Sequence, residues 1–209
     1  MKIKSCFTTL LFAVAGIFVF NVSSAQVNHR NNNISIVYEI TVSKKRHSGG
    51  LEETYNGGTK ALFISNNKAR IRLVSLMRIQ SIFFDCDNDA LKKATIMKES
   101  GKKKYLFRLT ALEWKLYNKK YDSLVCDTSF TDSLLIAGYP CRKAVIKLEN
   151  KKQVTVFYTD SIHAVNQFIE PLFNCVPGTV LQYEFTSKKG TVVFKAASIS
   201  SQKISPNIF

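Results

Sequence analysis

Alternation of apolar and polar residues, in runs that come in pairs, constrains the fold of this chain more than any other feature. Residues 142–148 and 153–158 form one pair of runs, and residues 181–185 and 192–196 form a second. A short polar turn separates the two members of each pair. Paired alternating runs of this kind are typical of antiparallel hairpins with one buried face. This stretch therefore predicts a β-rich fold.

The same alternation recurs through the rest of the chain and begins at residues 34–42. The further runs predicted to be strands are 62–64, 69–73, 78–84, 91–97, 105–109, 123–128 and 133–136. Together with the paired runs they amount to about ten strands joined by polar turns. We therefore expect a mainly β fold, built as a single highly curved antiparallel sheet that stays open like a half-barrel.

One or two short helices are expected beside the sheet. The best candidate is residues 161–172, whose apolar side chains recur at helical spacing: Ile162, Val165, Phe168, Ile169 and Leu172. The sequence Thr-Ala-Leu-Glu at 110–113 fits a helix capping box, although the helical pattern after it ends within two turns. Residues 203–209 are expected to form a surface tail.

Three short motifs in the last third of the chain carry a resemblance to a known family. They are Gly138-Tyr-x-Cys-x-Lys-Ala144, Phe157-Tyr-Thr-Asp160 and Phe173-x-x-x-Pro-Gly-x-x-Leu181. In this order they resemble the exported GLPGLI family and sister domains whose fold is similar to that of the lipoprotein carrier LolA. The family's Gly-Leu-Pro-Gly-Leu-Ile box appears here as Cys175-Val-Pro-Gly-Thr-Val180, with a cysteine at its first position. The resemblance implies a LolA-like half-barrel and brings no catalytic residues.

Residues 1–25 are predicted to be a secretory signal peptide. A basic start and an apolar core at 7–20 precede small residues at 23–25, which fit a cleavage site. The apolar core is shorter than the ~20 residues that a membrane-spanning helix needs. Removing 25 of the 209 residues leaves 184, enough for one domain with a sizeable core. We therefore expect residues 26–209 to be a single β-rich domain in the periplasm or cell envelope.

The chain is strongly basic. Without the two lysines of residues 1–25, 28 Lys+Arg against 15 Asp+Glu leave a net charge of +13. The basic residues are scattered, mostly at the ends of predicted strands and in turns, which indicates a solvated surface rather than a nucleic-acid site. Nucleic acid is therefore not expected as a partner, whereas an anionic membrane surface is kept as an alternative partner.

The predicted exported domain contains four cysteines: Cys86, Cys126, Cys141 and Cys175. An even number in an exported protein predicts one or two disulfides, and four cysteines allow three pairings. We expect at least one disulfide to use Cys141 or Cys175. Zinc is the competing interpretation, but no two cysteines have the C-x-x-C spacing.

The sequence does not point to an enzyme, a metal site or a cofactor. The three histidines that could serve as a catalytic base lie in a polar leader, a glycine-rich loop and a candidate helix start: His29, His47 and His163. The run Asp85-x-Asp-x-Asp89 could wrap calcium, but it lacks the glycine and distal glutamate of an EF-hand and fits a polar turn. A small hydrolase with a carboxylate-bearing cleft remains the least favoured alternative.

Non-enzymatic binding of an apolar ligand, an acyl chain or an apolar peptide, is the function that we expect. Several predicted strands carry large apolar side chains on both faces, so one face needs cover from a helix, a partner or a ligand. The helix at 161–172 could act as a lid over the concave side, or it could seal the core permanently. The residues expected to line the ligand site are Tyr105, Phe107, Val156, Tyr158, Ile162 and Phe168. The alternative function is a protein–protein interaction module that presents a basic sheet face to an envelope protein.

Overall fold

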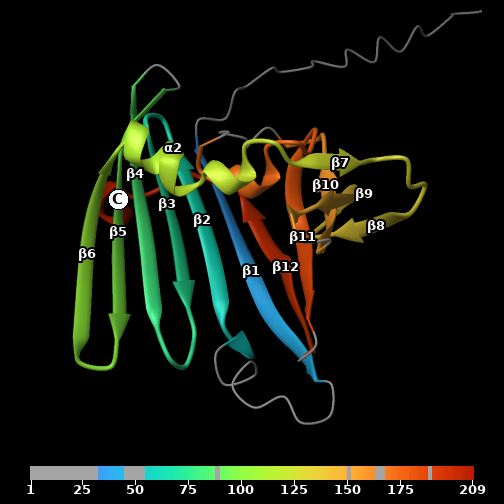
Figure 1. Cartoon of the computed structure of the whole chain (residues 1–209), viewed down its shortest axis with the longest axis horizontal. Coiled ribbons are helices and arrows are strands. Elements are labelled where there is room, and N and C mark those ends of the chain that lie inside the picture. The colour runs from blue at the N-terminus through green and yellow to red at the C-terminus, as the bar shows by residue number, and fades with distance from the viewer. Residues whose placement is uncertain (1–32, 45–54, 88–89, 150–151, 163–167, 188–189) are drawn as a thin grey trace, which may run out of the picture.

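A computed structural model of the chain describes residues 33–44, 55–87, 90–149, 152–162, 168–187 and 190–209. These residues form twelve strands in one open antiparallel sheet, which confirms the mainly β fold (Figure 1). The strands are β1 (Asn33–Lys44), β2 (Thr59–Ser65), β3 (Lys68–Val74), β4 (Ile79–Asp87), β5 (Ala90–Ser100), β6 (Lys103–Thr110), β7 (Val125–Asp127), β8 (Ser133–Ile136), β9 (Tyr139–Lys147), β10 (Gln153–Thr159), β11 (Thr179–Ser187) and β12 (Gly190–Ser200).

The order of the strands follows the chain except at two places, where β1 pairs with β12 and β9 pairs with β7. Neighbouring strands run in the order β6-β5-β4-β3-β2-β1-β12-β11-β10-β9-β7, so the first strand lies beside the last. All the pairings are antiparallel, and both predicted pairs of alternating runs are hairpins, β9–β10 and β11–β12. The short strands β7 and β8 flank a turn, yet each pairs with β9.

One face of the sheet, here called the inner face, carries the alternating apolar residues of β1. The register extends this face across six strands in rows that run perpendicular to the chain. One row consists of Ile36, Leu62, Ile71, Ile82, Ile96 and Phe107. The next row consists of Tyr38, Lys60, Leu73, Gln80, Lys98 and Tyr105. The intervening residues of each strand point to the opposite, outer face.

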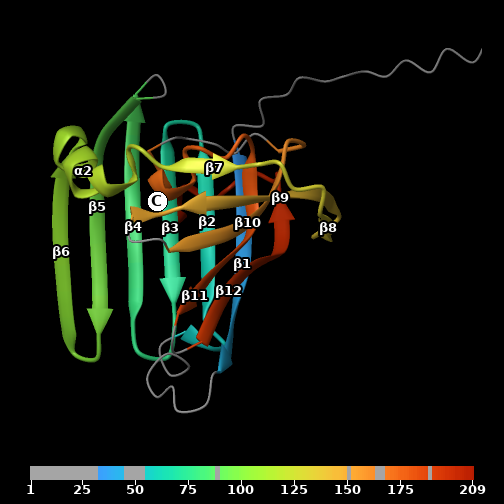
Figure 2. The same ribbon diagram turned by 45° about the vertical axis from the view of Figure 1, so that its right-hand side comes forward.

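The sheet coils so strongly that its two halves share one core. Figure 2 shows β9 and β10 crossing in front of β2 and β3. The Tyr38 hydroxyl on β1 donates a hydrogen bond to the carbonyl oxygen of Val180, at the start of β11, at 2.8 Å. The Tyr38 and Tyr183 rings meet edge to face, with centroids 6.2 Å apart. The inner face is therefore concave, and it is filled by its own side chains over β1, β11 and β12.

A short helix, α2 (Ala111–Tyr117), follows β6 and confirms the predicted capping box. The Thr110 hydroxyl accepts a hydrogen bond from the Glu113 backbone N–H, and the Glu113 carboxylate accepts one from the Thr110 backbone N–H. The helix ends after seven residues, as the fading pattern indicates, and it lies across the inner face at one end of β4–β6 (Figure 1). Its Trp114 side chain packs against Phe84 of β4, with ring centroids 5.3 Å apart.

Some of the sequence-based predictions fall on residues that the structure does not describe. The predicted signal peptide, the end of the aspartate run at Asp89 and residues 163–167 of the predicted helix lie outside the described residues. The helix prediction is wrong over residues 168–172, where the structure has a turn and a bend that lead into the 3-10 turn η3 (Pro171–Phe173), since Pro171 lacks the N–H that an α-helix needs there. Two further 3-10 turns are η1 (Lys119–Tyr121) and η4 (Pro206–Ile208).

The prediction of a surface tail at the C-terminus is wrong in part. Ile204 is buried, and the Arg70 Nη1 atom on the outer face of β3 donates a hydrogen bond to the Ile208 carbonyl oxygen at 2.7 Å. The last residues are therefore fixed to the outer face of the sheet, on the side away from α2 (Figure 1). None of the helices among the described residues has the length and apolar character needed to span a membrane.

Candidate functional site

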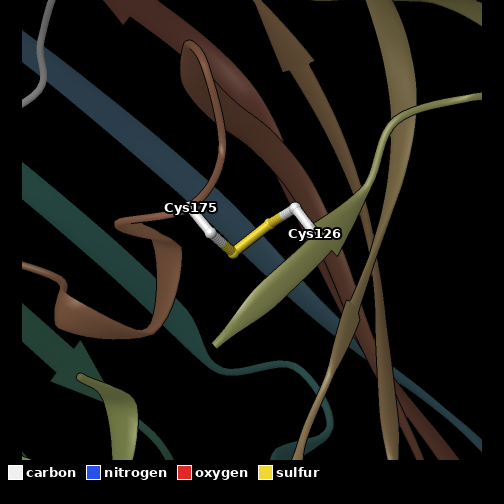
Figure 3. Close-up of a disulfide and its surroundings, with 2 residues drawn as sticks. All are labelled: Cys126 and Cys175. Carbon is white, nitrogen blue, oxygen red and sulfur yellow. A yellow bond between two sulfur atoms is a disulfide. The ribbon is translucent and has the colours of Figure 1, made fainter. Parts of the chain in front are cut away.

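Part of the inner face is closed by the segment 168–178, here called the cover. Ile169, Phe173 and Val176 of the cover are buried, and the Phe173 ring lies 5.0 Å from the Tyr183 ring of β11. A disulfide joins Cys175 of the cover to Cys126 of β7, with the two Cα atoms 5.6 Å apart (Figure 3). This bond confirms the prediction that a disulfide uses Cys141 or Cys175.

An ion pair inside the core holds the middle of the cover. Lys60 of β2 is only 4% exposed, and its Nζ lies 2.5 Å from Glu170 Oε1. The same Nζ donates a hydrogen bond to the Tyr183 hydroxyl at 3.1 Å and lies 4.6 Å from the centre of the Tyr38 ring. Aromatic faces attract a cation, so the lysine is stabilised by the rings of Tyr38, Tyr183 and Phe173 as well as by the carboxylate.

The two tyrosines of this cluster stay protonated far into the alkaline range. Burial, as the main cause, raises the pKa of Tyr38, while the charge of Lys60 opposes the rise. Burial and then the charge of Glu170 raise the pKa of Tyr183. Since a tyrosine in this state serves as a neutral hydrogen-bond donor, the cluster has a structural role in closing the core.

Both ends of the cover are also attached. The Trp114 Nε1 atom of α2 donates a hydrogen bond to the Phe168 carbonyl oxygen at 2.8 Å. At the other end Gly178 packs so closely on β10 that an added Cβ would lie 2.6 Å from the Thr159 carbonyl oxygen. Only glycine permits that approach, which gives a physical reason for the Pro-Gly turn. The described part of the cover is therefore a fixed seal rather than a free lid.

The structure separates the six residues predicted to line a ligand site. Val156 and Tyr158 on β10 and Ile162 beyond it are buried within the closed part of the core. Phe168 is partly buried where the cover meets α2. Tyr105 and Phe107 lie on β6 at the far end of the sheet, 47% and 48% exposed.

These last two residues belong to an apolar surface, here called the open flank, on the inner face of β4–β6. The register places two residues from each strand on it: Gln80, Ile82, Ile96, Lys98, Tyr105 and Phe107. Apart from α2 at one end, no described segment lies over this part of the sheet in Figure 1. The Lys98 Nζ lies 5.9 Å from the centre of the Phe107 ring, so an ammonium group stands beside the aromatic surface.

Four residues of the open flank were not predicted from the sequence. For two of them, the isoleucines, the alternating pattern offered a signal. Ile82 and Ile96 stand at alternate positions of two predicted strands, so the sequence alone predicts that each lies on the buried face of its strand. Their position beside Phe107 depends on the pairing of β4, β5 and β6, which alternation alone does not specify. Lys98 reads as an ordinary surface lysine until this register is known.

The open flank presents mainly apolar side chains. It combines apolar side chains with one cation, Lys98, and one amide, Gln80. All three histidines lie outside the described residues. Among the described residues, no three His, Cys, Asp or Glu side chains gather where they could hold a metal ion.

The two other cysteines of the described residues are not among the residues of the open flank. Cys141 on β9 is a buried thiol whose Sγ donates to the Tyr139 carbonyl oxygen at 3.4 Å. Burial raises its pKa to about 11. Cys86 is buried near the end of β4.

Comparison with known proteins leaves the fold and the open flank as the main guides to function. No protein-family model matches this chain, and no curated protein matches it either.

Proposed function

We propose that this protein is an exported, non-enzymatic envelope protein that binds an apolar ligand, an acyl chain or an apolar peptide, along the open flank. The observation that carries the proposal is the half exposure of Tyr105 and Phe107 on the edge strand β6, where Phe107 ends a continuous apolar row. Completing the burial of one half-exposed aromatic side chain contributes about 1 kcal/mol. Two such side chains therefore offer about 2 kcal/mol on binding, to which the partly buried Ile82 adds, whereas Ile96 is already buried.

The closed part of the inner face supports this choice of site. The cover is held by a disulfide, a buried ion pair and the Trp114 hydrogen bond. A ligand beneath it would have to displace Val156 and Tyr158 from a packed core. A ligand on the open flank would displace only water, and Lys98 could pair with an anionic end such as a carboxylate.

Binding of dodecanoate to the purified protein tests the proposal. Native mass spectrometry should show a complex with the wild-type chain, and Phe107→Asp should lower the affinity by roughly tenfold or more because a carboxylate then lies in the apolar contact. Leu106→Asp is the matched control, because Leu106 lies on the same strand, is 50% exposed and points to the outer face. Equal losses in the two variants, or no complex with the wild type, would overturn the proposal.

A second candidate function rests on the edge of the sheet at β6. Within the described residues β6 pairs only with β5, so its other side presents unpaired backbone groups. Its exposed Lys103, Lys104 and Arg108 would favour an acidic partner strand, although lysines at an edge can also block such pairing. The test is a peptide with alternating acidic and apolar residues. Binding to the wild type, and no binding to a variant with these three residues changed to Gln, would support the interaction module.

A further inference from the structure

The outer face of β3–β5 contains a groove that is separate from the open flank. It has a volume of about 160 Å³ and is lined by Arg70, Arg72, Ile79, Ser81, Phe83, Met97 and Glu99. A water molecule occupies ~30 Å³ in the liquid, so a phosphate group fits this space. The groove is on the side of the sheet opposite the proposed apolar ligand, and it can be tested independently.

Arg70 is held in place before any ligand arrives. Its guanidinium donates to the Ile208 carbonyl oxygen at 2.7 Å and to Ser81 Oγ at 3.1 Å, and it stacks on Phe83 with 4.7 Å between Cζ and the ring centre. Its Nε is buried and has no hydrogen-bond partner among the described residues. Buried donors of this kind usually find water or an ion.

The two arginines of the groove have no ion-pair partner among the described residues. Arg72 is exposed. Burial and the neighbouring charge of Arg72 lower the pKa of Arg70, which shows that the two like charges oppose each other. Glu99 lines the groove, but its carboxylate lies 3.9 Å from Lys104 Nζ, so another cation already offsets its charge.

We propose that this groove binds the phosphate group of a ligand between Arg70 and Arg72. A guanidinium offers paired donors that match the oxygens of a phosphate, and an anion between two arginines removes their mutual repulsion. The apolar residues Ile79 and Met97 line the groove beside the arginines. The phosphate could therefore belong to a free ion or to the headgroup of an anionic lipid.

The test uses the full chain and follows the arginine Nε–H signals by NMR. Inorganic phosphate should shift the signals of Arg70 and Arg72, and Arg72→Gln should weaken binding by roughly tenfold. Arg72 is the residue to change, because replacing Arg70 would also release Ile208 and could prevent folding. Arg108→Gln is the charge-matched control, since Arg108 is exposed on the outer face of β6 outside the groove and should leave the affinity unchanged.

Two further titrations distinguish the source of the phosphate. Phosphatidylcholine vesicles with and without phosphatidylglycerol, and a short-chain phosphatidylglycerol below its micelle concentration, are compared with inorganic phosphate. A lipid headgroup is indicated if the short-chain lipid binds more tightly than inorganic phosphate. In that case Met97→Asp should lower the affinity for the lipid to that for phosphate and leave the affinity for phosphate unchanged. A free phosphate is indicated if the two affinities are equal. Equal weakening by Arg72→Gln and Arg108→Gln, or no shift with any of the probes, would overturn the proposal.

Discussion

Lys60 and Glu170 form an ion pair across 110 residues of sequence, and it joins strand β2 to the cover of the inner face. Their surroundings differ: 5% of the Lys60 side chain is exposed, against 21% of the Glu170 side chain. Removing one member of a buried ion pair is costly because the other charge remains without compensation. The unequal exposure of the two groups therefore predicts unequal effects of two single substitutions.

Glu170→Gln should be the more destabilising of the two. It leaves the ammonium of Lys60 uncompensated in the core and should lower the free energy of unfolding by about 3 kcal/mol. Lys60→Met leaves a carboxylate that can still reach water, and about 1–2 kcal/mol is expected. Urea unfolding followed by tryptophan fluorescence measures both, with Lys60→Met/Glu170→Gln as the double variant that removes both charges. The reverse order of the two single variants would contradict this account.

Reduction of the Cys126–Cys175 disulfide should destabilise the chain without unfolding it completely. The bond closes a loop with a sequence separation of 49 residues, for which chain entropy predicts a loss of about 4 kcal/mol. The measurement is the urea midpoint with and without dithiothreitol. In a Cys126→Ser/Cys175→Ser variant the reductant should no longer change the midpoint, and a remaining shift would show that another disulfide contributes.

Local patterns were sufficient for the strands and for the short helix. Alternation located the hairpin β9–β10, and the capping box at Thr110 and Glu113 located α2, because both depend on neighbours within a few residues. The pairing of β1 with β12 joins the first and last strands of the chain in the middle of the sheet, and alternation within a strand does not specify such a distant partner. The sequence therefore predicts the elements and the open sheet, but not the order of the strands.

The site was harder to predict because exposure is a property of the assembled sheet. Tyr105 and Val156 both stand at apolar positions of alternating strands, yet one lies on an edge strand and the other in the core. Lys60 looks like a polar residue at the start of a strand, and its burial depends on Glu170 in a distant segment. Side chains that sequence reasoning placed in one ligand site are therefore divided between the core and the open flank.

If the open flank binds an acyl chain, Lys98 should favour ligands with an anionic end. Lys98→Met should weaken dodecanoate binding about threefold, the usual size of one partly exposed ion pair, and leave dodecanol binding unchanged. Lys93→Met is the control, because Lys93 lies on the same strand, points to the outer face and pairs with Asp85 at 3.0 Å. Competition calorimetry supplies the affinities. Equal losses for the acid and the alcohol would mean that Lys98 acts through packing rather than through its charge.

The buried thiol of Cys141 should make the fold sensitive to alkaline pH. Burial raises its pKa from 9.0 to about 11, so the folded chain keeps this proton over a range in which the unfolded chain loses it. The stability contributed by the neutral thiol is therefore complete below pH ~9 and declines towards pH ~11, by roughly 2–3 kcal/mol in all. Urea midpoints measured across this range should fall less steeply for Cys141→Ala than for the wild type, since the two chains differ only in this titrating group. Parallel pH profiles for the two chains, or rapid reaction of Cys141 with a maleimide in the folded protein at neutral pH, would show that the thiol is not protected as its burial requires.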